Sequence, residues 1–221
     1  MFAASAATPA LPALRASAML SVMGHPVVRT RLSEQEYLDF ERSSPEKHEY
    51  ADGEIFAMSG GTFEHSAVTA NLIGEARSAL ADRRCRVLES NMRVKVPSTN
   101  RYVYPDASIF CGRPEFPDET RDTLVNPRLI VEVLSDSTEA YDRGDKFEGY
   151  RSIPTFQEYV LASQKQPRIE VFTRQPDGSW MLRIYGPGER AVLASIEGAI
   201  EVDRVYEGVF DPGSPGQESS A

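Results

Sequence analysis

Cysteine is scarce in this chain of 221 residues, which contains only Cys85 and Cys111. Two cysteines far apart in the sequence provide neither a zinc knuckle nor a disulfide framework, and this usage is typical of a reducing cytoplasm. Both lie in strand-like runs, where a cysteine behaves as a small apolar residue. We therefore expect both to be apolar core residues.

Positive charge and long apolar runs are also in short supply. The 24 Lys and Arg face 33 Asp and Glu, which gives a net charge of −9. Because neutralising phosphates requires Lys and Arg, this balance counts against a protein that coats DNA. A nuclease stays open, since carboxylates gathered around a metal contribute to the acidity themselves. No run of about 20 apolar residues fits a membrane span, and Pro9 and Pro12 interrupt the run that a signal peptide needs.

The two ends of the chain have the composition of tails. Residues 1–28 are rich in Ala, Ser and Pro, have Arg15 as their only basic residue, and lack hydrophobic periodicity. Residues 211–221 are polar. Such segments bury too little apolar surface to offset the entropy lost on ordering. We predict disordered tails over 1–28 and 211–221 around one domain over 29–210, which is large enough to fold without a structural metal.

Helix and strand signals are mixed between the tails. Ser33 followed by Glu36 is a capping box and predicts a helix to about residue 42. Asp52-Gly53 predicts the turn of a hairpin, and hydrophobic spacing predicts a long helix over 62–81. Thr138 predicts the start of a helix that ends near residue 151. Strand-like runs occupy 85–96, 102–111, 129–134, 156–162, 168–174, 179–185 and 191–196. The pattern predicts one α/β domain with a mixed sheet.

Two strand-like runs each contain a carboxylate that their apolar pattern does not favour. Glu132 lies within LIVEVL, which reads as a central strand, and Asp106 opens a strand just after Pro105. A buried ionised carboxylate needs a cation, hydrogen bonds or a raised pKa. Carboxylates on neighbouring strands supply the oxygen ligands that Mg²⁺ or Mn²⁺ prefers, and such a metal activates water for phosphodiester cleavage. The alternative is that Asp106 ends a turn and Glu132 pairs with a core Arg or Lys.

The order of these blocks resembles the Uma2 family of restriction-endonuclease-like proteins, also called DUF820. The matching segments are KHEYADGEIFAMSGGTFEH (47–65), YVYPDASIF (102–110), NPRLIVEVLSDST (126–138) and YDRGDKFEGYRSIPTFQEYVL (141–161). The resemblance implies a restriction endonuclease-like PD-(D/E)xK core, in which a mixed central sheet is flanked by helices, here with extra C-terminal strands. It also implies that Asp106 and Glu132 hold Mg²⁺ or Mn²⁺.

One position departs from the superfamily pattern. The lysine of (D/E)xK is expected two residues after Glu132, where this chain has Leu134. The resemblance favours Lys146, in the helix after the Glu132 strand, as the catalytic lysine that orients water or stabilises charge. A solvated helix lysine is the alternative interpretation of Lys146, and Lys95 is a weaker contender for the role.

Glu54 and His65 belong to the matching segments, and we expect both to assist catalysis. Glu54 would be a third carboxylate for the metal or its water, and His65 begins the long helix. The alternatives are a surface residue at a strand end for Glu54 and a capping or packing histidine for His65.

The sequence thus predicts a Mg²⁺-dependent endonuclease that hydrolyses nucleic-acid phosphodiester bonds, with DNA as the favoured substrate, in the cytoplasm. Exposed strand edges and the habits of such nucleases favour a homodimer. Two alternatives stay open: the fold retained as a catalytically inactive binding or assembly module, and a metal-dependent hydrolase that acts on another substrate.

Overall fold

The computed structural model describes residues 27–29, 31–80 and 84–210. The predicted tails lie outside these residues except at Val27 and Val28. Those two residues belong to a strand that pairs with Ile55 and Phe56, so the prediction of disorder is wrong at Val27 and Val28.

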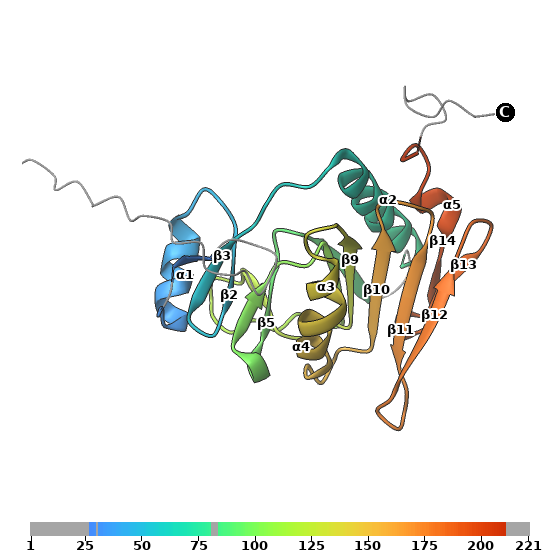
Figure 1. The fold of residues 1–221 in the computed structure, drawn as a ribbon. Helices are drawn as coiled ribbons and strands as arrows, with labels where there is room; N and C mark the ends of the chain where they lie inside the picture. Colours follow the sequence, from blue (N-terminus) through green and yellow to red (C-terminus); the bar gives the residue numbers. More distant parts are fainter. Residues whose placement is uncertain (1–26, 30, 81–83, 211–221) are drawn as a thin grey trace, which may run out of the picture.

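The elements follow the mixed pattern expected from the sequence (Figure 1). The strands are β1 (Val27–Arg29), β2 (His48–Ala51), β3 (Glu54–Ala57), β4 (Cys85–Glu89), β5 (Arg93–Val96), β6 (Arg101–Val103), β7 (Ala107–Cys111), β8 (Thr123–Leu124), β9 (Leu129–Leu134), β10 (Glu158–Ser163), β11 (Ile169–Arg174), β12 (Trp180–Tyr185), β13 (Arg190–Leu193) and β14 (Gly198–Glu201). The helical elements are α1 (Glu34–Ser43), α2 (Phe63–Ala79), η1 (Pro97–Thr99), α3 (Glu139–Tyr141), η2 (Asp142–Lys146), α4 (Phe147–Arg151), η3 (Ala194–Ile196) and α5 (Val202–Val205).

Local sequence signals set several of these boundaries. The Ser33 hydroxyl accepts a hydrogen bond from the Glu36 backbone, while the Glu36 carboxylate accepts one from the Ser33 backbone, which confirms the capping box before α1. The predicted turn at Asp52-Gly53 joins β2 to β3. Gly53 takes the left-handed conformation there at φ 97°, which a glycine adopts without steric cost.

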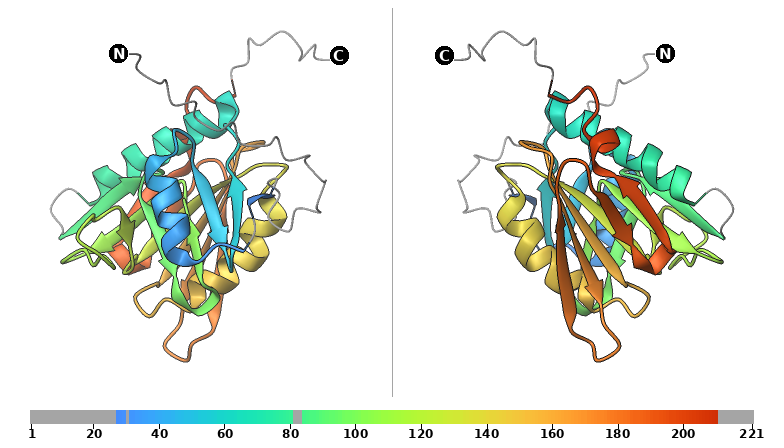
Figure 2. Two further views of the ribbon diagram at one scale, coloured as in Figure 1. Left: turned by 90° about the vertical axis from the view of Figure 1, so that its left-hand side faces the viewer. Right: turned by 90° about the vertical axis from the view of Figure 1, so that its right-hand side faces the viewer.

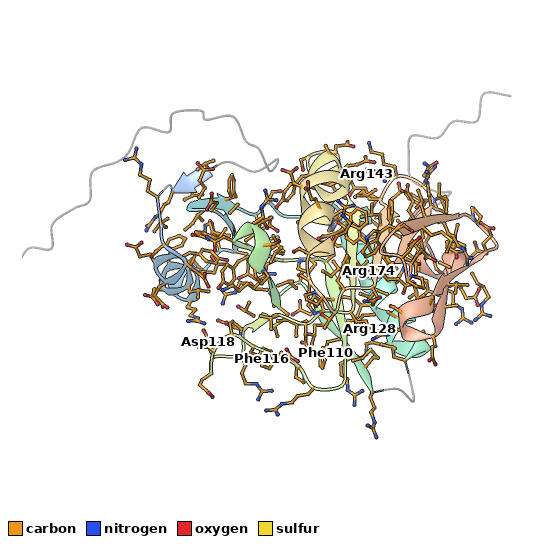
Figure 3. All side chains as sticks on the ribbon, turned by 90° about the horizontal axis from the view of Figure 1, so that it is seen from below. Phe110, Phe116, Asp118, Arg128, Arg143 and Arg174 are labelled. Atoms are coloured by element: carbon orange, nitrogen blue, oxygen red, sulfur yellow. A yellow bond between two sulfur atoms is a disulfide. The ribbon has the colours of Figure 1, made fainter. Side chains whose placement is uncertain are left out.

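Six strands in the order β1-β3-β2-β6-β5-β8 form what we call the outer sheet. Helix α1 packs on it through stacked aromatic rings, with the centroids of Tyr37 and Tyr50 4.9 Å apart. The loop that carries Phe116 and Asp118 passes beside this helix (Figure 3), where Arg42 forms ion pairs with Asp118 at 2.6 Å and Asp122 at 2.9 Å. These contacts hold the outer sheet and its helix together at one end of the molecule.

A second set of six strands, in the order β12-β11-β10-β9-β7-β4, forms the central sheet. Strands β9 and β10 are parallel and their neighbours antiparallel, so this sheet is mixed, as predicted. One face packs against α2, α5 and the β13–β14 hairpin, and the other packs against the helix formed by α3, η2 and α4 (Figure 2). Leu129, Val131 and Val133 of β9 face α2. Because strand side chains alternate, Glu132 faces the opposite side together with Ile130 and Leu134.

The run YVYPDASIF does not form the single strand that its pattern predicts. It divides into β6 in the outer sheet and β7 in the central sheet. Pro105 lies between them and lacks the N–H group that a continuous ladder requires. Asp106 therefore lies where the chain crosses from one sheet to the other.

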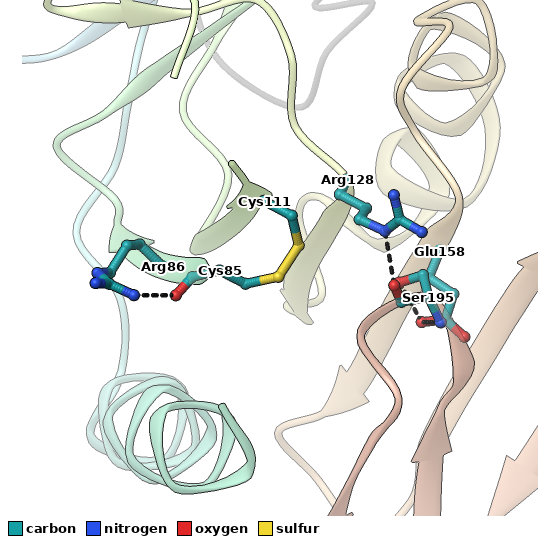
Figure 4. The surroundings of a disulfide bond; sticks show 6 residues. All are labelled: Cys85, Arg86, Cys111, Arg128, Glu158 and Ser195. Carbon is teal, nitrogen blue, oxygen red and sulfur yellow. Dashed lines mark hydrogen bonds between the residues drawn. A yellow bond between two sulfur atoms is a disulfide. The ribbon is translucent and has the colours of Figure 1, made fainter. Parts of the chain in front are cut away.

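Cys85 and Cys111 are joined by a disulfide, which corrects the interpretation of both as unpaired apolar residues (Figure 4). The antiparallel register of β4 and β7 places them directly opposite each other, with 3.9 Å between their Cα atoms. This proximity depends on strand pairing and is invisible in their sequence spacing. Cysteine usage therefore no longer supports a cytoplasmic location.

None of the helices in the described residues combines the length and the apolar character that a membrane span requires.

Candidate active site at the junction of the two sheets

Asp106 and Glu132 lie side by side, as the sequence predicts. Ala107 pairs with Val131 in the antiparallel register of β7 and β9, so Asp106 and Glu132 occupy the next opposing positions. The Val133 N–H donates a 2.7 Å hydrogen bond to Asp106 Oδ2. The Asp106 N–H donates a longer one, 3.4 Å, to Glu132 Oε2. These bonds fix both carboxylates at the end of the strand pair.

Lys146 points into this carboxylate group rather than into solvent. Its Nζ lies 3.1 Å from Glu132 Oε1, 3.2 Å from Asp142 Oδ1 and 3.5 Å from Glu49 Oε1. Its side chain is only 7% exposed. The alternative of a solvated helix lysine is therefore wrong, and the structure brings Lys146 to the predicted place. Leu134, at the usual lysine position, packs in the apolar cluster beneath α4.

A π-helical turn aims the polar residues of this helix at the sheet. Element η2 spans Asp142–Lys146, between the α-helical segments α3 and α4. Such wider turns occur mostly as short bulges inside α-helices, frequently at functional sites. Asp142, Lys146 and Tyr150 are all buried. These three residues, four positions apart, thus share one buried face of the helix, and it meets Glu132.

An ion pair anchors the π-helical turn to the central sheet. Arg143 (Figure 3) donates two hydrogen bonds to the buried Glu170 carboxylate on β11, at 2.7 and 3.0 Å. It also binds Glu139 at 2.8 Å within the helix. A two-pronged bond of this kind fixes orientation as well as distance. The turn that carries Asp142 and Lys146 is therefore tied on its outer side.

Two tyrosines complete the support beneath the carboxylates. The Tyr150 hydroxyl donates a 3.0 Å hydrogen bond to Glu132 Oε1, so this oxygen is held by both Lys146 and Tyr150. The Tyr159 hydroxyl donates to the backbone oxygen of Asp142 at 3.0 Å. Both rings are fully buried and lie edge to face, with centroids 5.6 Å apart.

Glu49 is a site residue that sequence reasoning missed. It lies on β2 and is 1% exposed, and its Oε1 accepts a hydrogen bond from the Tyr104 N–H at 3.2 Å. Its Oε2 is buried without a hydrogen-bond partner among the described residues. Buried polar atoms in native proteins are nearly always paired, so this oxygen is free for a ligand. A charged residue within an apolar strand was the signal for Glu132, and Glu49 offers a similar one, because it lies between the buried residues His48 and Tyr50.

Glu54 and Lys95 do not reach the site. Glu54 begins β3, at the turn end of the hairpin, and it does not line the cleft that contains the other carboxylates. Glu49 and Glu54 lie on the same face of the hairpin, since Ala51 pairs with Glu54 and Glu49 with Phe56, but Glu49 lies two residues further from the turn and so reaches the cleft. Lys95 forms its ion pair with Glu34 of α1 instead.

His65 does reach the site, from the first turn of α2. Its Nε2 lies 3.4 Å from Asp106 Oδ2, and its backbone N–H donates to the capping Thr62 hydroxyl at 3.2 Å. Burial works to lower the pKa of His65, but the hydrogen bond to Asp106 and its charge outweigh burial and raise the pKa. His65 thus has two roles: its backbone binds the helix cap, and its ring contacts a candidate metal ligand.

The charges of the site are out of balance. Burial raises the pKa of Glu132 well above its ordinary value, opposed by the Lys146 ammonium and reinforced by Asp142 and other carboxylates. The pKa of Lys146 is also raised: burial acts to lower it, but the charges of Glu132, Glu49 and Asp142 outweigh that effect. Glu132 therefore holds its proton more tightly than a solvated glutamate, mainly because it is buried, while Lys146 stays charged among the carboxylates.

These residues line one cleft of about 890 Å³. His65, Ser135 and Thr138 contribute to its wall, and Gly60 and Gly61 to its rim. Its acidic residues are Glu46, Glu49, Glu89, Asp106, Glu132, Asp136 and Asp142, and its basic ones are Lys47, Lys146 and His65. Across the described ranges, no group of three or more His, Cys, Asp or Glu has the arrangement of a formed metal site.

Residues 34–203 match the Uma2 family, described as "Putative restriction endonuclease". An uncharacterized protein of Synechocystis sp. is 38% identical over 181 residues, which cover 81% of this chain and 93% of that protein. A second uncharacterized protein of Synechocystis sp. is 36% identical over 151 residues, or 68% of this chain and 85% of that protein.

A solved structure gives the fold independently. The crystal structure titled as a putative nuclease belonging to DUF820, from Anabaena variabilis, superposes with a TM-score of 0.65. The match covers 81% of this chain and 99% of that one, at 16% sequence identity. The predicted restriction endonuclease-like fold is confirmed.

Proposed function

Since the chain belongs to the Uma2 family, we propose that it is a Mg²⁺- or Mn²⁺-dependent endonuclease that hydrolyses phosphodiester bonds of nucleic acid, with DNA as the favoured substrate. One observation carries this proposal: Asp106 and Glu132 oppose each other on neighbouring strands, and the Lys146 ammonium lies 3.1 Å from Glu132. These are the three groups that the superfamily chemistry requires, although the lysine comes from the following helix.

The donor chemistry of the site fits a hard divalent cation. Carboxylate oxygens are the ligands that Mg²⁺ and Mn²⁺ prefer. Asp106 and Glu132 would hold the ion, and the unpaired Oε2 of Glu49 offers a further buried oxygen in the same cleft. The proton that burial favours on Glu132 is what a cation would replace. When bound, such an ion lowers the pKa of a water molecule and offsets charge on the phosphate.

The protein's own groups have distinct parts in this proposal. Lys146 donates hydrogen bonds to the attacking water or to a phosphate oxygen, which places fixed positive charge where negative charge develops. Tyr150 holds Glu132 in orientation through its 3.0 Å hydrogen bond. His65, on α2, contacts the Asp106 carboxylate and helps to hold it in place. Glu49 replaces Glu54 in the assisting role, because Glu54 lies outside the cleft.

An inactive binding module is the second candidate. Lys146 already neutralises part of the charge of Glu132, and the described residues contain no formed metal cluster. A fold that had lost catalysis would show this internal pairing. The two candidates differ in one measurable respect, which is cleavage.

The test is single-turnover cleavage of single- and double-stranded DNA and RNA, with Mg²⁺ or Mn²⁺, at fixed salt. We expect Lys146→Met to fold normally and to lower the cleavage rate by about 10²-fold or more, the usual effect of removing a positioned proton-transfer or charge-stabilising group. Lys95→Met is the matched control, because its partner Glu34 lies on α1. Loss of cleavage in Lys95→Met alone would relocate the catalytic lysine. If the wild-type protein cuts none of these substrates, the binding-module function takes over.

A further inference from the structure

The two edges of the central sheet are built differently. Strand β4, at one edge, exposes the charged side chains of Arg86 and Glu89. Charged residues on an edge are a common protection against pairing with another strand. Strand β12, at the other edge, exposes Met181 by 37%, Leu182 by 43% and Ile184 by 49%. Strand β12 exposes only one charged side chain, Arg183, so it is less protected than β4.

The apolar exposure is concentrated at this edge. Four of the seven large hydrophobic side chains exposed in the described part of the chain gather on β12 and the adjacent β13: Met181, Leu182, Ile184 and Val192. Leu182 and Ile184 lie on one face of β12 and Met181 lies on the other, because strand side chains alternate, so apolar side chains flank the open backbone edge on both faces. In Figure 1 these strands lie at the end of the molecule opposite α1.

The backbone of β12 also has unpaired hydrogen-bonding groups along this edge. The Arg174 N–H donates to Gln157 of the β10 side, and the Gln175 N–H donates to Ser179 of the β12 side, both at 2.8 Å. Because hydrogen-bonding direction alternates along a strand, residues 181, 183 and 185 bond to β11. The N–H and C=O groups of Trp180, Leu182 and Ile184 therefore point away from β11, and no strand of the described chain pairs with them there.

We propose that this edge binds a second copy of the chain, with β12 pairing antiparallel to β12 of its partner across a two-fold axis. An open row of backbone donors and acceptors is a template for another strand, and a strand that meets its own copy pairs both with one surface. The strand is also self-complementary. When Leu182 faces Leu182 of the partner subunit, Trp180 faces the partner's Ile184, and each of these pairs exchanges two backbone hydrogen bonds.

Charge selects this register over its neighbours. A shift by two residues in one direction would place Arg183 directly opposite Arg183 of the partner subunit, and like charges in that position are destabilising. The opposite shift would place Ile184 against the partner's Gly178, which has no side chain to cover it. The register centred on Leu182 instead places Arg183 beside Met181 of the partner subunit.

The resulting assembly leaves the cleft accessible. No residue of β12 lines the cleft. Pairing would join two six-stranded central sheets into one continuous sheet of twelve strands. The homodimer expected from the sequence thus acquires a specific surface, and this inference does not depend on the nuclease chemistry.

The test is the mass of the full-length protein in solution, measured by sedimentation over a range of concentrations. The chain has a mass of 24.5 kDa, so we expect the wild-type protein to approach 2 × 24.5 = 49 kDa. Leu182→Lys, which buries a charge at the centre of the pairing, should sediment as a monomer at concentrations where the wild type is a dimer. Circular dichroism checks that the variant is folded, and Ile184→Lys serves in its place if it is not.

Val28→Lys is the matched control. Val28 is exposed by 46% on β1, which is an edge strand of the outer sheet. This variant should remain dimeric. A dimer that survives Leu182→Lys, or that is lost in Val28→Lys instead, would place the interface elsewhere and overturn the proposal.

Backbone hydrogen exchange tests the pairing itself. The amides of Trp180, Leu182 and Ile184 should exchange slowly in the wild-type dimer and rapidly in Leu182→Lys. A protein that stays monomeric up to its solubility limit contradicts the proposal. Slow exchange of these three amides in such a monomer would show that another segment of the same chain covers the edge.

Discussion

Glu132 and Glu158 stand on the neighbouring parallel strands β9 and β10, and both are buried. The Glu158 carboxylate is surrounded by neutral donors: Ala194 N–H at 2.7 Å, and the N–H and hydroxyl of Ser195 at 3.0 and 2.6 Å. These bonds hold the turn after β13 against the sheet (Figure 4). Glu132 instead shares its surroundings with Lys146 and other carboxylates.

The difference shows two ways in which a protein accommodates a buried acid. Neutral donors that saturate a carboxylate fix structure and leave nothing for a ligand to add. A cluster with more acids than cations is held at a cost, since desolvation and mutual repulsion both oppose ionisation. Burial alone does not distinguish a structural from a functional glutamate, whereas the count of satisfied donors does.

Exchanging each glutamate for its amide is the sharpest way to break this comparison. Glu132→Gln should lower the cleavage rate by about 10²-fold or more, since it removes a proposed metal ligand, while changing the free energy of unfolding by less than about 1 kcal/mol. Glu158→Gln should do the reverse: it should destabilise the fold by about 2 kcal/mol, because hydrogen bonds to a charged acceptor are lost, and leave the rate of folded enzyme unchanged. Urea unfolding and single-turnover cleavage give the two readouts. Equal effects on both would erase the distinction.

Asp106 offers a second test of the unbalanced site. Asp106→Asn preserves shape and removes one of the opposing charges. We expect weaker Mn²⁺ binding in calorimetry, together with a metal-free protein at least as stable as the wild type, because the carboxylates repel one another without a cation. Glu54→Gln is the control, since Glu54 lies outside the cleft. Unchanged Mn²⁺ affinity in Asp106→Asn would place any metal elsewhere.

The pH dependence of stability should carry the same signature. The pKa of Glu132 is raised in the folded protein, mainly by burial. Above the pKa of the unfolded state, the folded state therefore binds more protons at this group, and its contribution to stability falls as pH rises. We expect thermal melting of the metal-free protein to show this fall, and Glu132→Gln to reduce it. A profile identical in the two proteins would mean that Glu132 is ionised without penalty.

Asp122 should titrate in the opposite sense, with a smaller effect. Burial works to raise its pKa, but Arg42 and Arg93 outweigh burial and lower the pKa to about 2. The stabilisation from this group is therefore complete above the unfolded pKa and is lost as pH falls towards 2. Acid unfolding of Asp122→Asn should be less steep than that of the wild type over this range. Because Asp122 is partly exposed, solvent reduces the effect.

The sequence predicts local features well where a single residue type enforces them. The capping box at Ser33, the turn at Asp52-Gly53 and the helix that starts after Thr138 are all present. Each follows from hydrogen bonding or spacing within a few residues. The adjacency of Asp106 and Glu132 was also predicted, although only with the help of the family pattern.

Features that depend on strand pairing were missed. Pro105 marks a break in the run 102–111, but it does not show that Tyr102 and Ile109 belong to different sheets, because both halves are equally apolar. The opposition of Cys85 and Cys111 arises only when β4 lies beside β7. Glu49 was overlooked for Glu54 because both lie on one face of the hairpin, and its sequence does not show how far from the turn the rest of the protein meets it.

The widened turn at η2 fixes the number of residues that this helix can have between Asp142 and Tyr150. Asp142 and Lys146 lie within it, and Tyr150 follows in α4. Gly144 lies in the middle of the turn and is exposed, with open space where a side chain would be. Substitution there is therefore sterically tolerated, but removal is not. One residue corresponds to about 100° of rotation in an α-helix, so a single deletion would swing Asp142 around the axis relative to Lys146 and Tyr150. The length of this turn is therefore more tightly constrained than the identity of its exposed residue Gly144.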